Sequence, residues 1–182
     1  MRVSLFAVLL VGACASAEPA YFTLAPVPGV ARAGGPPLVE LRRPGIAGYL
    51  DRPEIVRSGE YQLRVAANER WGEPFGDLFG RVLAEDLNRR LPGTTVFTSN
   101  GSISAPADAT VEVDVQRFDA DAAGLVTLSA QVAVSRQRRG PAVTRAIRLT
   151  RPAGGTTVDL VATMSALMGE MAEVVAGMVR GG

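Results

Sequence analysis

The single cysteine, Cys14, has the most distinctive chemical setting in the sequence. A basic residue, Arg2, is followed by a short apolar stretch, residues 3–11, and then by Gly12 and Ala13. A charged start, an apolar middle and small residues at a cleavage point are the features of a secretory signal. The stretch is too short to span a bilayer, which needs about 20 apolar residues. A cysteine directly after the small residues predicts a bacterial lipoprotein that is cleaved before Cys14 and acylated there on its thiol and new amino group.

The alternative interpretation is an ordinary signal peptide that is cleaved after Ala17 and has an incidental cysteine nearby. We favour the lipoprotein because Cys14 is the sole thiol of the chain and lies directly after Val11, Gly12 and Ala13. The expected organisation is a signal peptide at residues 1–13, a lipidated tether at residues 14–20 and one domain at residues 21–182.

Several residue types needed for common catalytic sites are missing from the sequence. There is no histidine, which excludes a Ser-His-Asp triad, a Cys-His pair and an imidazole metal site or base. All 19 basic residues are arginine, so a Walker-type phosphate loop, which needs lysine, cannot form. Carboxylates remain, and a glycosidase needs only two of them. The composition therefore disfavours an enzyme, and we expect no metal ion and no cofactor.

The size and charge of the chain indicate one protein domain that does not bind nucleic acid. The 182 residues, less the signal, suffice for a single domain, and a hydrophobic fraction of 47% can supply its core without disulfides or metals. The formal net charge of +1 gives no reason to expect a nucleic-acid partner.

Two stretches show the spacing of apolar residues that is typical of helices. The first covers residues 75–91, with Pro74 suited to the first helical turn and Pro92 ending the pattern. The second starts after residue 156, with Thr156 as its candidate N-cap and Asp159 near the positive end of the helix dipole. Its methionines would suit either the cover of a sheet or an adaptable groove for a partner. We favour the sheet cover.

Alternating apolar and polar residues predict the strands. The strongest signals lie at residues 111–116, 126–135 and 143–150, and their short polar connectors favour an antiparallel meander. Weaker strands are expected at residues 21–24, 38–43, 61–67 and 94–99. Strands, helix, strands and helix in this order predict an α+β fold in one domain, with a mostly antiparallel sheet and two helices packed on one face.

Several sequence blocks are specific enough to indicate a family. The blocks are LDRP-IV at residues 50–56, RW-EP at residues 70–74 and VLAEDL at residues 82–87. Together with YFTL at residues 21–24 and the lipobox, they resemble the PqiC-like auxiliary lipoproteins of ABC-type transport systems. The resemblance makes the following residues a structural family motif rather than catalytic groups: Pro53, Glu69, Arg70, Trp71, Glu73 and Pro74.

The resemblance also implies a function and a location. Such lipoproteins accompany transporters whose periplasmic subunit carries an MCE (mammalian cell entry) domain, and these systems move phospholipids or other hydrophobic compounds between the inner and outer membranes of Gram-negative bacteria. The expected partners are that MCE-domain subunit, the outer membrane through the N-terminal lipid, and a second copy of the chain. Ala15 follows the cysteine where an aspartate would signal retention in the inner membrane. We therefore expect anchoring in the outer membrane, facing the periplasm.

Two other functions are compatible with the sequence. One is a scaffold lipoprotein of an unrelated envelope machine. The other is a carboxylate-based hydrolase of the envelope, for which Asp51, Glu69 and Glu73 would be the candidate acids. A simpler interpretation of these carboxylates is salt bridging in loops with Arg52 and Arg70.

The loop at residues 49–53 is the candidate partner interface. It combines Tyr49, Asp51 and Arg52 with Pro53, which limits the freedom lost on binding. Loops on a rigid scaffold often carry recognition, and Tyr and Arg are frequent at interface hot spots. An internal salt bridge that only shapes the fold is the alternative. Trp71 is expected to bury its ring and anchor the connector before the first helix.

Overall fold

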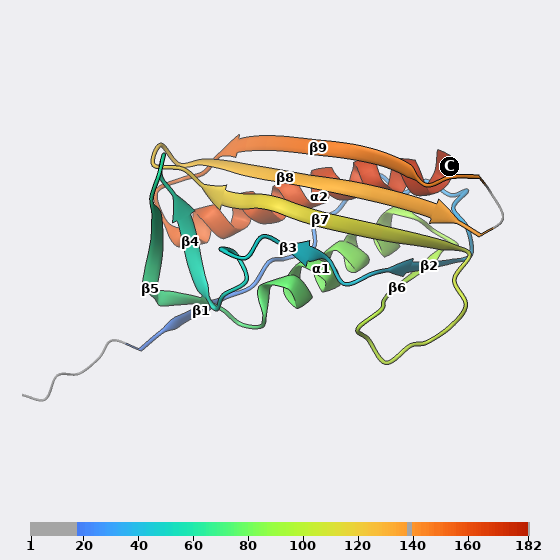
Figure 1. Cartoon of the computed structure of the whole chain (residues 1–182), viewed down its shortest axis with the longest axis horizontal. Coiled ribbons are helices and arrows are strands. Elements are labelled where there is room, and N and C mark those ends of the chain that lie inside the picture. The colour runs from blue at the N-terminus through green and yellow to red at the C-terminus, as the bar shows by residue number, and fades with distance from the viewer. Residues whose placement is uncertain (1–17, 138–139, 182) are drawn as a thin grey trace, which may run out of the picture.

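The longest strands of the protein form an antiparallel meander. The computed structural model describes residues 18–137 and 140–181, and Cys14 lies outside these residues. β7 (Ala109–Ala120) pairs with β8 (Leu125–Arg136), and β8 pairs with β9 (Val143–Pro152). All three run along the long axis of the molecule (Figure 1). This meander confirms the strongest strand prediction.

β8 pairs with one edge of β7. Three short strands pair with the other edge, one after another in chain order. These are β2 (Leu38–Leu41), β3 (Gly45–Ile46) and β4 (Glu54–Ser58), and all three run parallel to β7. The sheet continues on both sides of this row with β6 (Thr95–Thr98) beside β2, β5 (Leu63–Trp71) beside β4, and β1 (Ala20–Phe22) beside β5. In the described part of the chain the sheet has nine strands.

The sheet is mixed, so the prediction of a mostly antiparallel sheet is wrong. β1 pairs parallel with β5, and β2 pairs parallel with both β6 and β7. Period-2 alternation indicates which face a residue occupies, but it contains no information on the direction of the neighbouring strand. The alternation also misses β4, because a register shift between Glu54 and Val56 leaves consecutive residues Ile55 and Val56 both buried.

Both helices lie along one side of the sheet (Figure 1). α1 (Phe75–Arg90) and α2 (Thr157–Gly181) pack against each other, and α2 also contacts β7, β8 and β9. Inward residues of β7 such as Val111 and Val115 are buried, whereas Glu112 and Asp114 between them face solvent. One face of the sheet is therefore covered and the other is open to water.

The apolar face of α2 belongs to the core of the protein. Its buried side chains include four methionines: Met164, Met168, Met171 and Met178. The helix is long and apolar enough to cross a membrane, but most of its apolar stretch is buried within the fold. Sheet cover is thus the arrangement found for the methionine face.

Thr156 caps the start of α2 as the sequence predicts, and Asp159 completes a capping box with it. The Asp159 N–H donates to Thr156 Oγ1 at 3.1 Å, and the Thr156 N–H donates to Asp159 Oδ2 at 3.1 Å. These reciprocal bonds satisfy backbone donors that a helix start leaves free. The Asp159 carboxylate also accepts a bond from the Thr156 hydroxyl at 2.7 Å, and this bond, with the one from the Thr156 N–H, lowers the pKa of Asp159.

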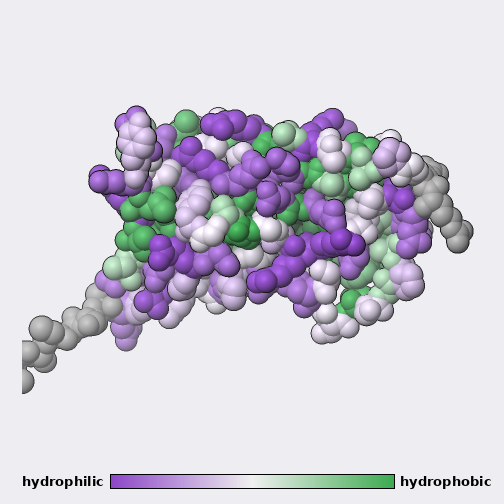
Figure 2. Space-filling view, viewed as in Figure 1, coloured by the Kyte–Doolittle hydropathy of each residue, from purple (hydrophilic) through white to green (hydrophobic). Residues whose placement is uncertain are grey.

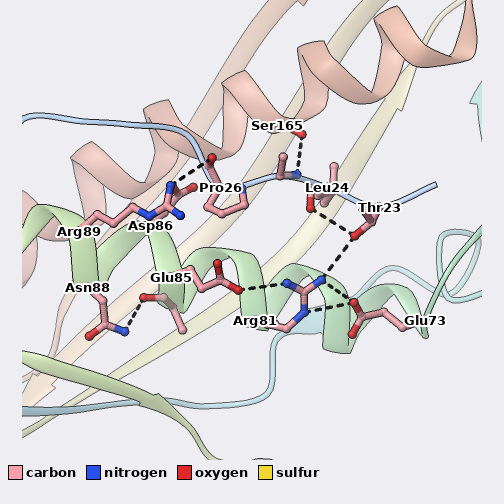
Figure 3. A network of polar contacts seen from close by, with 12 residues as sticks. Thr23, Leu24, Pro26, Glu73, Arg81, Glu85, Asp86, Asn88, Arg89 and Ser165 are labelled. Atoms are coloured by element: carbon pink, nitrogen blue, oxygen red, sulfur yellow. Dashed lines mark hydrogen bonds and ion pairs between the residues drawn. The ribbon is translucent and has the colours of Figure 1, made fainter.

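The segment after β1, residues 23–32, crosses between the two helices, and we call it the strap (Figure 3). The Val27 N–H donates to Asp86 Oδ1 at 2.8 Å, and the Ala25 N–H donates to Ser165 Oγ at 3.1 Å. Arg90 is buried beneath the strap and donates to the Val27 carbonyl, to Asp86 Oδ1 at 3.2 Å and to Glu173 Oε1 at 2.9 Å. The strap therefore ties β1 to both helices. Burial raises the pKa of the Asp86 carboxyl, against the lowering effect of the Val27 N–H and Arg90.

Candidate functional site

Two family blocks from different parts of the chain meet at one cavity. The loop before β4 faces the junction between β5 and α1, and the two enclose a pocket of about 330 Å³. Backbone bonds fix this arrangement, since the Trp71 N–H donates to the Pro53 carbonyl at 2.7 Å and Glu54 lies opposite Arg70 in the β4–β5 ladder. We call this cavity the motif pocket. It is lined by Asp51, Arg52, Pro53, Trp71, Glu73, Pro74 and Phe75.

Aromatic side chains form the base of the motif pocket. The ring of Trp71 lies 5.0 Å from the ring of Phe75, measured between centroids. Phe75 in turn packs against Phe79 and Phe118, which belong to the central core. Trp71 is only 6% exposed and Phe75 is buried. The pocket base is thus a rigid apolar surface that continues into the core, and Trp71 is buried as the sequence predicts.

Charged side chains surround the opening of the pocket. Glu73 accepts from Arg81 at 2.6 Å, and Arg81 also donates to Glu85 at 3.1 Å (Figure 3). The hydrogen bond with Glu73 and the nearby negative charges raise the pKa of Arg81. On the other side, Arg52 pairs with Glu54 at 3.3 Å while remaining 40% exposed. The pocket therefore combines an apolar base with a rim of opposite charges.

The remaining residues of the predicted interface and motif lie around the pocket rather than in it. The Tyr49 hydroxyl donates to Asp119 Oδ2 at 2.5 Å, which fixes the loop to β7. Burial, reinforced by that bond, raises the pKa of Tyr49 well above its usual value. Glu69 accepts a hydrogen bond from Thr157 Oγ1 at 2.6 Å, which joins β5 to the start of α2.

The sequence suggests that Asp51, Glu69 and Glu73 form salt bridges with Arg52 and Arg70, but the structure pairs the charges differently. Arg52 pairs with Glu54 and Glu73 pairs with Arg81, whereas Asp51 is exposed at the pocket rim. The Arg70 Nε atom is buried and has no hydrogen-bond partner among the residues that the structure describes. Within residues 18–137 and 140–181, no group of three acidic or sulfur side chains is placed to hold a metal ion. The arrangement favours recognition of an apolar group with a polar edge.

Two residues of this region could not be identified from the sequence pattern. Phe75 fits the helical spacing but carries no signal that it lines a pocket. Asp119 lies in a run of acidic and small residues, yet it is completely buried and accepts bonds from Tyr49, Ser58 and Arg117. Its partners are distant in sequence, so only the folded chain shows that it supports the loop.

Comparison with known proteins places the chain in a family. The sequence profile described as "ABC-type transport auxiliary lipoprotein component" matches residues 22–176. This chain belongs to the ABC-type transport auxiliary lipoprotein family. The match confirms the resemblance seen in the sequence blocks, and it extends from Phe22, the last residue of β1, through the rest of the sheet and α1 to Ala176 in α2. The family is one of transport components rather than of enzymes.

Solved structures show that the fold of this auxiliary lipoprotein is shared. The crystal structure of an uncharacterized protein is 19% identical, with a TM-score of 0.75, and the match covers 90% of this chain and 99% of that one. The crystal structure of protein XCC0632 from Xanthomonas campestris is 18% identical, with a TM-score of 0.72, and the match covers 90% and 95% of the two chains. No curated protein matches the sequence.

Proposed function

We propose that this protein is the outer-membrane-anchored auxiliary component of an MCE/ABC-type system that moves phospholipid or other hydrophobic compounds between the inner and outer membranes. The observation that carries the proposal is the family match over residues 22–176. It agrees with the lipobox that precedes Cys14. In this proposal the protein performs no catalysis; it faces the periplasm from its lipid anchor and holds the periplasmic MCE-domain subunit.

The motif pocket is the surface that we propose for docking. An apolar side chain of the MCE-domain subunit would enter the pocket over Trp71 and Phe75, where burial of apolar area stabilises the complex. Asp51 and Arg52 at the rim would pair with polar groups of the partner. Tyr49 would hold the loop in the binding conformation through Asp119 and contribute its partly exposed ring. A preformed pocket lowers the entropy lost on association.

Lipid anchoring is tested with Cys14→Ala in cells that are fed labelled fatty acid. The variant should remain uncleaved or become soluble and should carry no acyl label, because it lacks the thiol that accepts the lipid. The wild-type protein should take up the label and fractionate with the outer membrane. If Cys14→Ala still carries label and still partitions with the outer membrane, the anchor lies elsewhere.

Docking is tested by pull-down from membranes with the partners identified by mass spectrometry. Arg52→Glu should abolish recovery of the MCE-domain subunit, because it reverses the charge at the pocket rim. The melting temperature should move by no more than a few degrees, since exposed ion pairs contribute only about 0–1 kcal/mol. The matched control is Arg148→Glu on β9, an exposed arginine outside the pocket, which should leave recovery unchanged.

The same pull-down distinguishes the proposal from its alternatives. Recovery of a permease, an ATPase and an MCE-domain subunit supports the transport role. Recovery of a different envelope assembly would instead identify a scaffold for that machine, and recovery of a second copy of this chain alone would show self-association. Normal recovery with Arg52→Glu, or a large loss of its stability, contradicts docking at the motif pocket.

A further inference from the structure

Exposed apolar side chains gather at one end of the molecule. In the described residues, nine large hydrophobic side chains are exposed. Six of them belong to β1, to β5 and the turn before it, to the start of β8, or to the start of α2: Tyr21, Tyr61, Leu63, Val65, Leu125 and Val158. These elements lie together at the left end in Figure 1, where Figure 2 shows hydrophobic surface beside the point at which the chain enters the domain.

Hydrogen bonds hold this end together as one surface. Thr157 at the start of α2 bonds to Glu69 of β5 and accepts from Arg57 of β4. Arg57 lies opposite Ala120 at the end of β7, close to the turn that leads into β8. The exposed residues therefore keep fixed positions relative to one another. We call this set of six side chains the apolar end.

The apolar end includes a strand edge that other described strands leave uncovered. β5 pairs with β4 on one edge, but β1 covers only residues 69–71 of its other edge. Residues 63–68, which include Leu63 and Val65, thus have no neighbouring strand on that edge within the described part of the chain. The adjacent hollow is lined by Arg57, Arg64, Glu60 and Asp121 among others, so positive and negative side chains balance there. Apolar surface, rather than net charge, distinguishes this end.

The tether joins the domain at the apolar end. β1 starts at Ala20, and Cys14 is six residues earlier. A fully extended chain spans at most about 3.5 Å per residue, so these residues reach no more than about 20 Å. β7 has 12 residues, and at about 3.4 Å per residue it carries the opposite end of the sheet about 40 Å away. A lipid on Cys14 therefore holds the apolar end, and not the opposite end, close to a bilayer.

We propose that the apolar end rests on the surface of the bilayer that holds the lipid anchor. The proposal depends on lipidation of Cys14, which belongs to the proposed function. Tyrosine suits the boundary between lipid and water, because its ring is apolar and its hydroxyl remains hydrated. The tether keeps the local concentration of lipid at this end high, so a small apolar surface is enough for contact. The long axis then projects away from the membrane.

The test places a fluorescent probe at each end of the full chain. Tyr61→Trp puts an indole at a side chain that is 91% exposed at the apolar end, and Val143→Trp puts one at a side chain that is 47% exposed at the other end. Trp71 is present in both variants and in the wild-type chain, which supplies the baseline. The chain is attached through the thiol of Cys14 to a maleimide-bearing lipid in vesicles of brominated phosphatidylcholine, whose bromine atoms quench nearby indoles.

On the brominated vesicles the Tyr61→Trp variant should lose most of the fluorescence that its new indole adds to the wild-type signal. The Val143→Trp variant should keep the fluorescence that its new indole adds. Equal emission from the two variants, with flotation confirming that both are attached, overturns the proposal. Chemical attachment makes the outcome independent of lipidation in the cell. Absence of acyl label on the cell-made protein would instead refute the proposed anchor.

Discussion

Trp71 joins three elements where the N-terminal strand meets the rest of the fold. It is the last residue of β5, it lies opposite Phe22 of β1, and its ring packs against Phe75 at the start of α1. A ring in such a position cannot be removed without leaving a cavity that the neighbouring aromatic rings are too rigid to fill.

Replacing Trp71 with alanine should lower the free energy of unfolding by about 3–5 kcal/mol, which is the usual cost for a buried large aromatic. Chemical denaturation of the purified protein measures this loss. The control is Tyr61→Ala, because that ring is 91% exposed and its removal should change stability by no more than about 0.5 kcal/mol. Equal effects of the two substitutions would show that the Trp71 ring does not pack as described.

Arg90 is the second residue on which the fold depends, because it is charged and almost completely buried. Arg90→Met should destabilise the protein by about 3–5 kcal/mol, since it leaves the buried carboxylate of Asp86 without its ion-pair partner. Arg42→Met is the matched control. Arg42 pairs with Glu112 at the surface, where an ion pair contributes about 0–1 kcal/mol. A loss no larger than that of the control would mean that Asp86 is satisfied without Arg90.

The sequence predicts part of the candidate site at the level of residues. The blocks that contain Pro53 and Trp71 are recognisable as a unit, and the structure brings them to one pocket. The hydrogen bond from Tyr49 to Asp119, which holds the loop at residues 49–53 in place, cannot be predicted in this way. The two residues are 70 positions apart, and no sequence pattern links them. The role of Arg90 is also hidden. It lies on the apolar face of α1, two turns after Leu83, and no local pattern shows that it pairs with Glu173 of α2.

At the scale of elements, the strap lies so close to α2 that Gly169 has no room for a side chain. A Cβ atom at that position would lie 3.0 Å from Val27 Cβ and 3.2 Å from an Arg90 nitrogen. Val27 has little freedom to move away, because its N–H is bonded to Asp86 and its carbonyl to Arg90. The absence of a side chain thus lets the strap lie directly against the helix.

Two glycine substitutions in the same helix should have opposite effects. Gly177→Ala should raise the free energy of unfolding by about 0.5–1 kcal/mol, because alanine favours the helix and a Cβ there meets no atom within 4 Å. Gly169→Ala should lower it, because the strap must shift. Denaturation measures both, and limited proteolysis of residues 23–32 reports whether the strap loosens. A stabilising Gly169→Ala would show that the strap adapts freely.

The sequence predicts the elements better than their connections. Both helices and the β7–β9 meander follow from apolar spacing and short polar connectors, which are local signals. The parallel pairing of β2, β3 and β4 with β7 depends on chain segments that return from a distance, and no local pattern specifies it. The alternation predicts a strand from Tyr61, but β5 starts at Leu63 because a turn that begins at Gly59 extends to Gln62.

At the scale of the whole molecule, the proposed contact between the apolar end and the bilayer can be tested by changing the length of the tether. A flexible insertion of ten Gly/Ser residues between Ala17 and Glu18 has a mean end-to-end distance of about 16–19 Å. Local lipid concentration at the apolar end then falls. The Tyr61→Trp probe should lose much less of its added fluorescence on brominated vesicles with this insertion than without it. Unchanged quenching would show that contact with lipid does not depend on the tether.

The parallel pairing of β1 with β5 also determines how the protein responds to mechanical load. A pull on the N-terminal end of β1, directed along the strand, acts on an edge strand of the sheet (Figure 1). Pulled in this direction, the bonds of β1 to residues 69–71 are stressed in shear and must break together. The bonds of the strap to Asp86 and Glu173 lie directly behind them. With the proposed lipid on Cys14 and the proposed partner at the motif pocket, this N-terminal segment would transmit force between the two without unravelling from its end.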